Sequence, residues 1–333
     1  MSDNTRARSQ MQLLVDLMPY VPEDFALKGG TAINMFCRDL PRYSVDMDLV
    51  YIPRADRLTA VRSMHGLMEQ MRRAAQRGLR GVTTSQVHGG KDEKAGLLWV
   101  EVRRGEVSVR IETPVSGRQT LYAPSILDAV SAAELEFGRA RMKVVSFDEM
   151  YAGKVGASLG RRQLRDMFDI FHLFQHEGLT EDLFRTFLVY AVAYGRPPHM
   201  ILSRAWHARK LPEQKRWEEL MRTTLPMDRL LATNAELRQQ CADRITPQVR
   251  QFLLDVHDGS ADPGVIGIPE AAIWPGFLWR LQQRALFKAK KPHEHARQRR
   301  EIEGIGGNEY DTPSWGYSGV GKGDDSRATE ICR

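Results

Sequence analysis

Two aspartates, Asp46 and Asp48, stand two positions apart within residues 45–52, where acids alternate with apolar side chains as in a β-strand. Side chains two apart on a strand project from one face, so the two carboxylates converge. Converging carboxylates repel each other unless a cation lies between them. The pair therefore predicts a site for Mg²⁺, which takes oxygen ligands and shares them with substrate phosphates. The competing interpretation is a solvated strand face, where Asp-x-Asp also occurs.

A glycine turn lies upstream of the aspartates. Gly29, Gly30 and Thr31 stand between a short apolar strand expected over 25–27 and a short helix expected over 32–36. Bare backbone N–H groups at a strand-to-helix turn can hold phosphate oxygens. The order of strand, glycine turn, helix and acidic strand favours metal-assisted phosphoryl chemistry more strongly than either motif alone.

The elements around these motifs predict an α+β N-terminal domain, residues 1–125. An amphipathic helix is expected over 11–18 and a basic amphipathic helix over 55–80. Two strands, at 97–103 and 106–114, are close enough to form a hairpin. This domain must hold the glycine turn beside the acidic strand.

A mainly helical domain is expected over residues 126–300, where helical periodicity replaces Gly and Pro. Ser146 and Glu149 match the capping box, in which the two side chains satisfy orphan N–H groups at a helix start. Two further helices are expected within 164–178 and 180–195. The active site is expected between the two domains.

The chain has a net positive charge and an acidic C-terminal tail. The net charge of the 333 residues is +6, and residues 301–333 hold seven acids, three bases and seven glycines. Such a composition cannot offset the entropy of ordering, so the tail is expected to be disordered. Because the net charge of this tail is −4, residues 1–300 alone have a net charge of +10, which favours a polyanionic partner.

The cysteines and the hydropathy pattern indicate a cytoplasmic protein. Three cysteines scattered singly fit neither a disulfide framework nor zinc spacing, so a reduced compartment is expected. The first residues lack the pattern of a signal peptide. No apolar run approaches the ~20 residues of a membrane-spanning helix, so no membrane contact is expected.

The sequence around the two motifs resembles the signature of the AbiEii family, the nucleotidyltransferase toxins of type IV toxin–antitoxin systems. The resemblance lies in Leu27-Lys28-Gly29-Gly30-Thr31-Ala32 and Leu40-Pro41-Arg42-Tyr43-Ser44-Val45-Asp46-Met47-Asp48-Leu49. It implies a polymerase-β-like domain that binds a nucleoside triphosphate and Mg²⁺, with Asp46 and Asp48 as catalytic metal ligands. The nucleotide-binding positions that it implies here are Lys28, Gly29, Gly30, Thr31, Arg42 and Ser44.

The broader superfamily keeps a third carboxylate on a neighbouring strand, usually an aspartate. Glu112 is the matching candidate for a metal ligand in this sequence. The alternative is that Glu112 is an exposed strand residue paired with Arg110 or Arg103.

Two later stretches resemble the remaining AbiEii motifs, Glu149-Met150-Tyr151-Ala152-Gly153-Lys154 and Arg161-Arg162-Gln163-Leu164-Arg165-Asp166-Met167-Phe168-Asp169. By this resemblance Lys154 and Asp166 are catalytic and Arg165 contacts the nucleotide. An ammonium suits the charge that builds on a leaving pyrophosphate, and Asp166 would position Lys154 or the attacking group. Asp169 is expected to be structural. The alternatives are an exposed helical lysine and an Asp–Arg ladder that only fastens two helices.

The resemblance also implies an acceptor, the 3′ end of tRNA, whose modification blocks translation and growth. Two alternatives remain: a nucleotidyltransferase acting on a small-molecule or protein hydroxyl, and a non-catalytic binding module. The basic stretch 280–300 and Arg72, Arg73, Arg77 and Arg80 are candidate RNA contacts, unless they are ordinary basic surface helices. A cognate antitoxin is implied as a partner that need not bind the enzyme directly.

Overall fold

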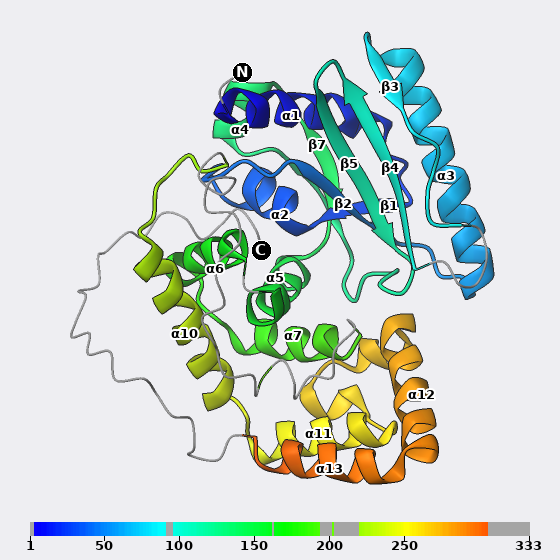
Figure 1. Cartoon of the computed structure of the whole chain (residues 1–333), viewed down its shortest axis with the longest axis vertical. Helices are drawn as coiled ribbons and strands as arrows, with labels where there is room; N and C mark the ends of the chain where they lie inside the picture. Colours follow the sequence, from blue (N-terminus) through cyan, green and yellow to red (C-terminus); the bar gives the residue numbers. More distant parts are fainter. Residues whose placement is uncertain (1–2, 91–95, 162, 194–201, 203–219, 306–333) are drawn as a thin grey trace.

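The chain folds into a mixed β-sheet with a group of helices on one side of it (Figure 1). The computed structural model describes residues 3–90, 96–161, 163–193, 202 and 220–305. The predicted α+β class is confirmed. Most of the tail that is expected to be disordered, from residue 306 onward, lies outside the described residues.

The sheet has the strand order β3-β4-β5-β2-β1-β7-β6. Its strands are β1 (Phe25–Lys28), β2 (Asp46–Tyr51), β3 (Val82–Thr84), β4 (Leu97–Arg104), β5 (Val107–Pro114), β6 (Ser125–Asp128) and β7 (Arg141–Val144). β2 pairs antiparallel with β1 and parallel with β5, and β4 and β5 form the expected hairpin. The acids of β2 therefore lie in the middle of the sheet.

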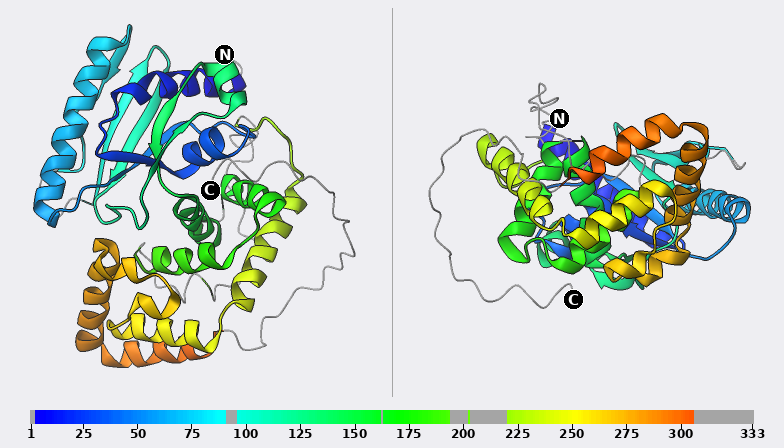
Figure 2. Two further views of the ribbon diagram at one scale, coloured as in Figure 1. Left: turned by 180° about the vertical axis from the view of Figure 1, so that it is seen from behind. Right: turned by 90° about the horizontal axis from the view of Figure 1, so that it is seen from below.

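Helices α1 (Asp3–Leu17) and α3 (Arg57–Gly78) cover one face of the sheet (Figures 1 and 2). Alternate side chains of β4 and β5 are buried against them, namely Leu98, Val100, Val102, Val109 and Ile111. Since successive strand residues point to opposite faces, the polar residues of the same strands lie on the other face. That other face carries both aspartates of β2.

The glycine turn is itself the start of a helix. α2 (Gly29–Ala32) follows β1 without a gap and continues as a π-helical stretch, Ile33–Cys37. The expected helix therefore begins three residues earlier than predicted, at Gly29. A π-helical turn is rare and often marks a functional region.

The second half is mainly helical. Its helices are α5 (Phe147–Arg161), α6 (Leu164–His176), α7 (Glu181–Ala193), α10 (Met227–Asp243), α11 (Pro247–Asp258), α12 (Pro275–Lys290) and α13 (Pro292–Glu303), with short 3₁₀ turns at Pro263–Ile266 and Pro269–Ile273. No helix in the described part of the chain is long and apolar enough to cross a membrane.

Two expectations about this half are wrong. Residues 126–145 are expected to be helical, but apart from α4 (Ser131–Phe137) they contribute β6 and β7 to the sheet, which therefore runs past residue 125 to Val144. Strands of four residues show too little periodicity to be recognised unless a neighbouring motif marks them, as the glycine turn marks β1. The tail is expected to start at residue 301, but α13 continues to Glu303, and Ile302 and Ile305 are buried.

Glu149 fastens the loop after β5 to the helices. The predicted capping box forms in part, because the Ser146 hydroxyl accepts a hydrogen bond from the Glu149 N–H at 3.3 Å. The Glu149 carboxylate also accepts hydrogen bonds from the backbone N–H groups of Leu121 and Tyr122, at 2.7 and 3.3 Å, and from the hydroxyl of Tyr190 at 2.8 Å. Burial raises the pKa of Glu149 although these bonds act in the opposite direction.

Glu149→Gln should lower the free energy of unfolding by about 1–3 kcal/mol, because the new amide donor would face N–H and hydroxyl donors. Urea denaturation measures this loss. Glu106→Gln is the matched control, since Glu106 is exposed in the turn between β4 and β5. Equal and small changes in both variants would contradict a structural role for Glu149.

Candidate active site

The acidic strand and the glycine turn meet at Asp48. In the sheet register Asp48 lies opposite Lys28 of β1 and Glu112 of β5. Gly29 has a φ of +74°, and a Cβ added there would stand 2.3 Å from a carboxylate oxygen of Asp48. Only glycine fits this conformation and this contact. The two motifs that the sequence assigns to metal and phosphate are thus brought together.

Gly30 is in close contact with the loop that leads into β2. A Cβ at Gly30 would lie 2.7 Å from both Arg42 Nη2 and Ser44 Oγ. The buried Thr31 hydroxyl lies 3.2 Å from the carbonyl oxygen of Ser44 and 2.5 Å from that of Asp46, and donates to them. Thr31 therefore fixes the backbone from which the Asp46 side chain projects, while its role in nucleotide binding stays a prediction.

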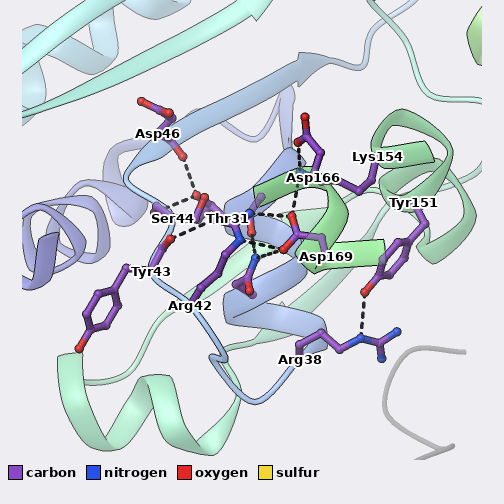
Figure 3. A network of polar contacts seen from close by, with 12 residues as sticks. Thr31, Arg38, Arg42, Tyr43, Ser44, Asp46, Tyr151, Lys154, Asp166 and Asp169 are labelled. Carbon is purple, nitrogen blue, oxygen red and sulfur yellow. Dashed lines mark hydrogen bonds and ion pairs between the residues drawn. The ribbon is translucent and has the colours of Figure 1, made fainter. Parts of the chain in front are cut away.

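Asp169 of α6 joins the helices to this loop (Figure 3). Its carboxylate accepts hydrogen bonds from Arg42 Nε at 2.8 Å and Nη2 at 2.6 Å, and the two side chains are only 1% and 2% exposed. Lys154 Nζ of α5 lies 2.8 Å from the same carboxylate. Burial alone would raise the pKa of Asp169, but the charges of Arg42 and Lys154 outweigh it and hold the pKa well below its usual range.

Lys154 and Asp166 form a second buried ion pair. Lys154 Nζ donates to Asp166 Oδ1 at 3.0 Å, and the lysine side chain is 7% exposed, so the alternative of an exposed helical lysine is wrong. Asp166 Oδ2 is buried and accepts no hydrogen bond from the described residues, although Arg161 Nε lies 3.5 Å away. A buried acceptor atom without a hydrogen-bond donor is uncommon. Asp166 Oδ2 could accept a hydrogen bond from a substrate.

Asn34 belongs to no sequence motif, yet it links the two halves. Its Nδ2 donates to the Gly30 carbonyl oxygen at 2.8 Å and to Asp169 Oδ1 at 3.2 Å. Its own Oδ1 is buried without a hydrogen-bond donor among the described residues. The only signal in the sequence is an amide side chain one helical turn after Gly30 in an otherwise apolar stretch.

The sequence predicts both Arg42 and Arg165 at the nucleotide. The Arg42 guanidinium is buried, bonded to Asp169 and, through Nη1, to the Tyr43 carbonyl oxygen at 3.0 Å. It therefore holds the loop in place and presents few free donors. Arg165 is half-buried on α6 and has neither a hydrogen bond nor an ion pair with another described residue. Contact of either arginine with a phosphate stays a prediction.

Glu112 has the ion pair that the alternative interpretation required. Its carboxylate lies 3.0 Å from Arg110 Nε, and both side chains are partly exposed. Burial raises the pKa of Glu112, and the neighbouring charge of Asp48 adds to this while Arg110 opposes it. The candidate third carboxylate is thus near Asp48 and is also occupied by Arg110.

The metal-binding residues fit an ion that substrate helps to hold. Within the described ranges, no three His, Cys, Asp or Glu side chains are grouped as a ready metal site. Mg²⁺ is usually bound by one or two carboxylates together with phosphates and water. Asp46 and Asp48, two apart on one face of β2, match that donor set.

Asp169→Asn leaves Arg42 and Lys154 buried with too little opposite charge. Breaking a buried ion pair in this way costs about 3–5 kcal/mol, so the urea midpoint should fall. Asp128→Asn is the matched control, because Asp128 pairs with Arg141 where both side chains are about 70% exposed. That control should cost at most about 1 kcal/mol. Equal losses in the two variants would contradict the central position of Asp169.

The low pKa of Asp169 also makes this contribution depend on pH. An aspartate in the unfolded chain has a pKa of about 3.9, so between that value and the lower folded pKa the native state binds fewer protons than the unfolded state. The stabilisation is fully present above the unfolded pKa and is lost as pH falls toward the folded one. Wild type should therefore lose stability more steeply than Asp169→Asn below about pH 5.

Comparisons with known proteins give a family and a similar fold. The model of the nucleotidyl transferase AbiEii toxins of type IV toxin–antitoxin systems matches residues 12–253. The fold is similar to that of MenT4, a nucleotidyltransferase toxin of Mycobacterium tuberculosis H37Rv, with a TM-score of 0.53 and 18% identity over 85% of this chain and 95% of that one. A search of curated protein sequences finds no match. The chain belongs to the AbiEii family of nucleotidyltransferase toxins.

Proposed function

We propose that this enzyme transfers a nucleoside monophosphate from a nucleoside triphosphate to RNA, at the 3′ end of tRNA, and so inhibits growth. The observation that supports this most is one continuous set of contacts. Asp48 lies against Gly29, Arg42 lies against Gly30, and Arg42 is joined through Asp169 to Lys154. Carboxylates, a glycine turn and a lysine are the groups that metal-assisted nucleotidyl transfer requires.

Each group has a role in an in-line displacement. The N–H groups of Gly29 and Gly30 would hold the phosphates that leave as pyrophosphate. Mg²⁺, when bound to Asp46 and Asp48, supplies charge neutralisation on the phosphates and favours ionisation of the acceptor hydroxyl. The acceptor oxygen then bonds to the α-phosphorus while the bond to the pyrophosphate breaks.

Lys154 would stabilise the charge that builds on the leaving pyrophosphate. Two carboxylates hold its Nζ, at 3.0 and 2.8 Å, which fixes the ammonium before the substrate arrives. Preorganised charge of this kind costs no reorganisation during the reaction. We assign Asp166 to the positioning of Lys154, and its second oxygen to a hydroxyl of the nucleotide.

The helices predicted to contact RNA offer fewer unpaired cations than the sequence suggests, so they support an RNA acceptor less strongly. Six of the eight cations of residues 280–300 bond to the protein itself: Arg280, Arg284, Lys288, Lys291, Arg297 and Arg299. Arg72 and Arg73 both pair with Glu69. The support for RNA is the net charge and the family, and the path of RNA across these helices stays a prediction.

A small-molecule or protein acceptor is the second candidate, and salt separates it from RNA. Activity on an acceptor held through several phosphates falls steeply as salt rises, whereas activity on a small acceptor does not. A non-catalytic module is disfavoured because Lys154 and both carboxylates around it remain buried as one cluster. We place the enzyme in the cytoplasm with its RNA acceptor, and a cognate antitoxin need not contact it.

The test is to incubate purified protein with total tRNA, Mg²⁺ and each α-³²P-labelled nucleoside triphosphate in turn. One nucleotide should label RNA, and Asp48→Ala should reduce the label by about 10²–10³-fold, as expected for the loss of a group that stabilises transition-state charge. Chelation of the metal should abolish labelling. Glu106→Ala, exposed and away from β2, is the control that should retain it. No label on RNA with any nucleotide would overturn the tRNA acceptor.

A further inference from the structure

A row of side chains crosses the open face of the sheet from Asp48 toward its β3 edge. Asp48 lies opposite Glu112, and Glu112 lies opposite Trp99 of β4. His88 forms an isolated antiparallel bridge with Trp99, closed by backbone hydrogen bonds of 2.9 and 3.2 Å. Residues paired in register point to the same face, so His88 and Trp99 share the face of Asp48. Neighbouring strands are about 4.8 Å apart, which puts Trp99 roughly 10 Å from Asp48.

Three flat groups are stacked in this row. The His88 and Trp99 rings lie 4.0 Å apart and 17° from parallel. The Arg110 guanidinium lies 4.4 Å from the centre of the Trp99 ring, and Glu112 holds it through Nε at 3.0 Å. Trp99 lies between its two neighbours because β4 lies between the His88 bridge and β5. Since Arg110 is on β5, the strand next to β2, it is the end of the stack that is nearest to β2.

The stack is accessible. His88 is exposed, the side chain of Arg110 is 44% exposed, and Trp99 is half-buried on the face opposite α1 and α3. Removing any of the three does not open the hydrophobic core, which lies on the other side of β4.

We propose that the Arg110–Trp99–His88 stack binds the terminal nucleobase of the RNA acceptor, with the base lying on the Arg110 guanidinium. This inference rests on the proposed nucleotidyl transfer. Unpaired bases stack on aromatic rings and on arginine planes. Such stacking tolerates any base, since every base has a π-face.

The order of the strands assigns the stack to the acceptor and not to the incoming nucleotide. The glycine turn follows β1, on one side of β2, and Arg110 and Trp99 lie on β5 and β4, on the other side. In an in-line displacement the attacking and leaving oxygens lie on opposite sides of the phosphorus. If pyrophosphate leaves toward Gly29 and Gly30, the attacking hydroxyl approaches from the side of β5.

The test is steady-state transfer to tRNA by wild type, Trp99→Ala, Trp99→Phe and Arg110→Lys. Trp99→Ala removes the ring that holds the Arg110 plane under the base. It should raise the KM for RNA by roughly 5- to 100-fold, because stacking is worth about 1–3 kcal/mol per base. Arg110→Lys keeps the positive charge but loses the planar guanidinium, so it should also raise the KM for RNA. Trp99→Phe keeps an aromatic ring and should retain most of the affinity for RNA. The KM for the nucleoside triphosphate should not change in any variant.

Leu135→Ala is the control, because Leu135 is 89% exposed on α4, which is not one of the helices predicted to contact RNA. It should leave the KM for RNA unchanged. A tRNA whose terminal base has been removed should behave with wild type as intact tRNA does with Trp99→Ala. A rise in the KM for the triphosphate, or an equal rise in the KM for RNA with Leu135→Ala, would overturn the assignment. Wild type that labels no RNA would instead refute the proposed function.

Discussion

The architecture of the site depends on one buried carboxylate, that of Asp169. Two cations from different elements, Arg42 before β2 and Lys154 on α5, are removed from water and bonded to it. Burying charge is costly unless each charge is paired and hydrogen-bonded. Together with Asp166 the cluster contains two cations and two anions, so the charges balance only when the loop and both helices are in place. Any displacement of the loop would leave a charge unpaired.

This constraint links residues from both halves of the chain. Arg42 lies against Gly30, and Asn34 bonds both the Gly30 carbonyl oxygen and Asp169. The position of the glycine turn is therefore tied to the position of Lys154. On the opposite side of β2 the sheet carries Arg110 and Trp99. Our two proposals therefore place the phosphates and the acceptor on separate flanks of the same strand.

The parts of the site that the sequence predicts are those that local rules govern. Asp46 and Asp48 follow from strand periodicity, and the glycine turn from the chemistry of its backbone. The bond between Arg42 and Asp169 joins residues 127 positions apart, and no local pattern reports it. Asn34 and the Trp99 stack depend on the pairing of distant elements in the same way. The strands β6 and β7 were missed because four residues are too few to show a period, and no motif marks these strands as the glycine turn marks β1.

The most direct test of this account is a double-mutant cycle on the transfer reaction with Arg42→Gln, Asp169→Asn and the double variant. The rates are measured under conditions where all the proteins remain folded, as monitored by circular dichroism. If the pair acts as one unit that holds the glycine turn against Lys154, the double variant will be about as slow as Asp169→Asn alone, because that variant already loses the bonds to Arg42. Losses that multiply, or single variants with the wild-type rate, would contradict the account.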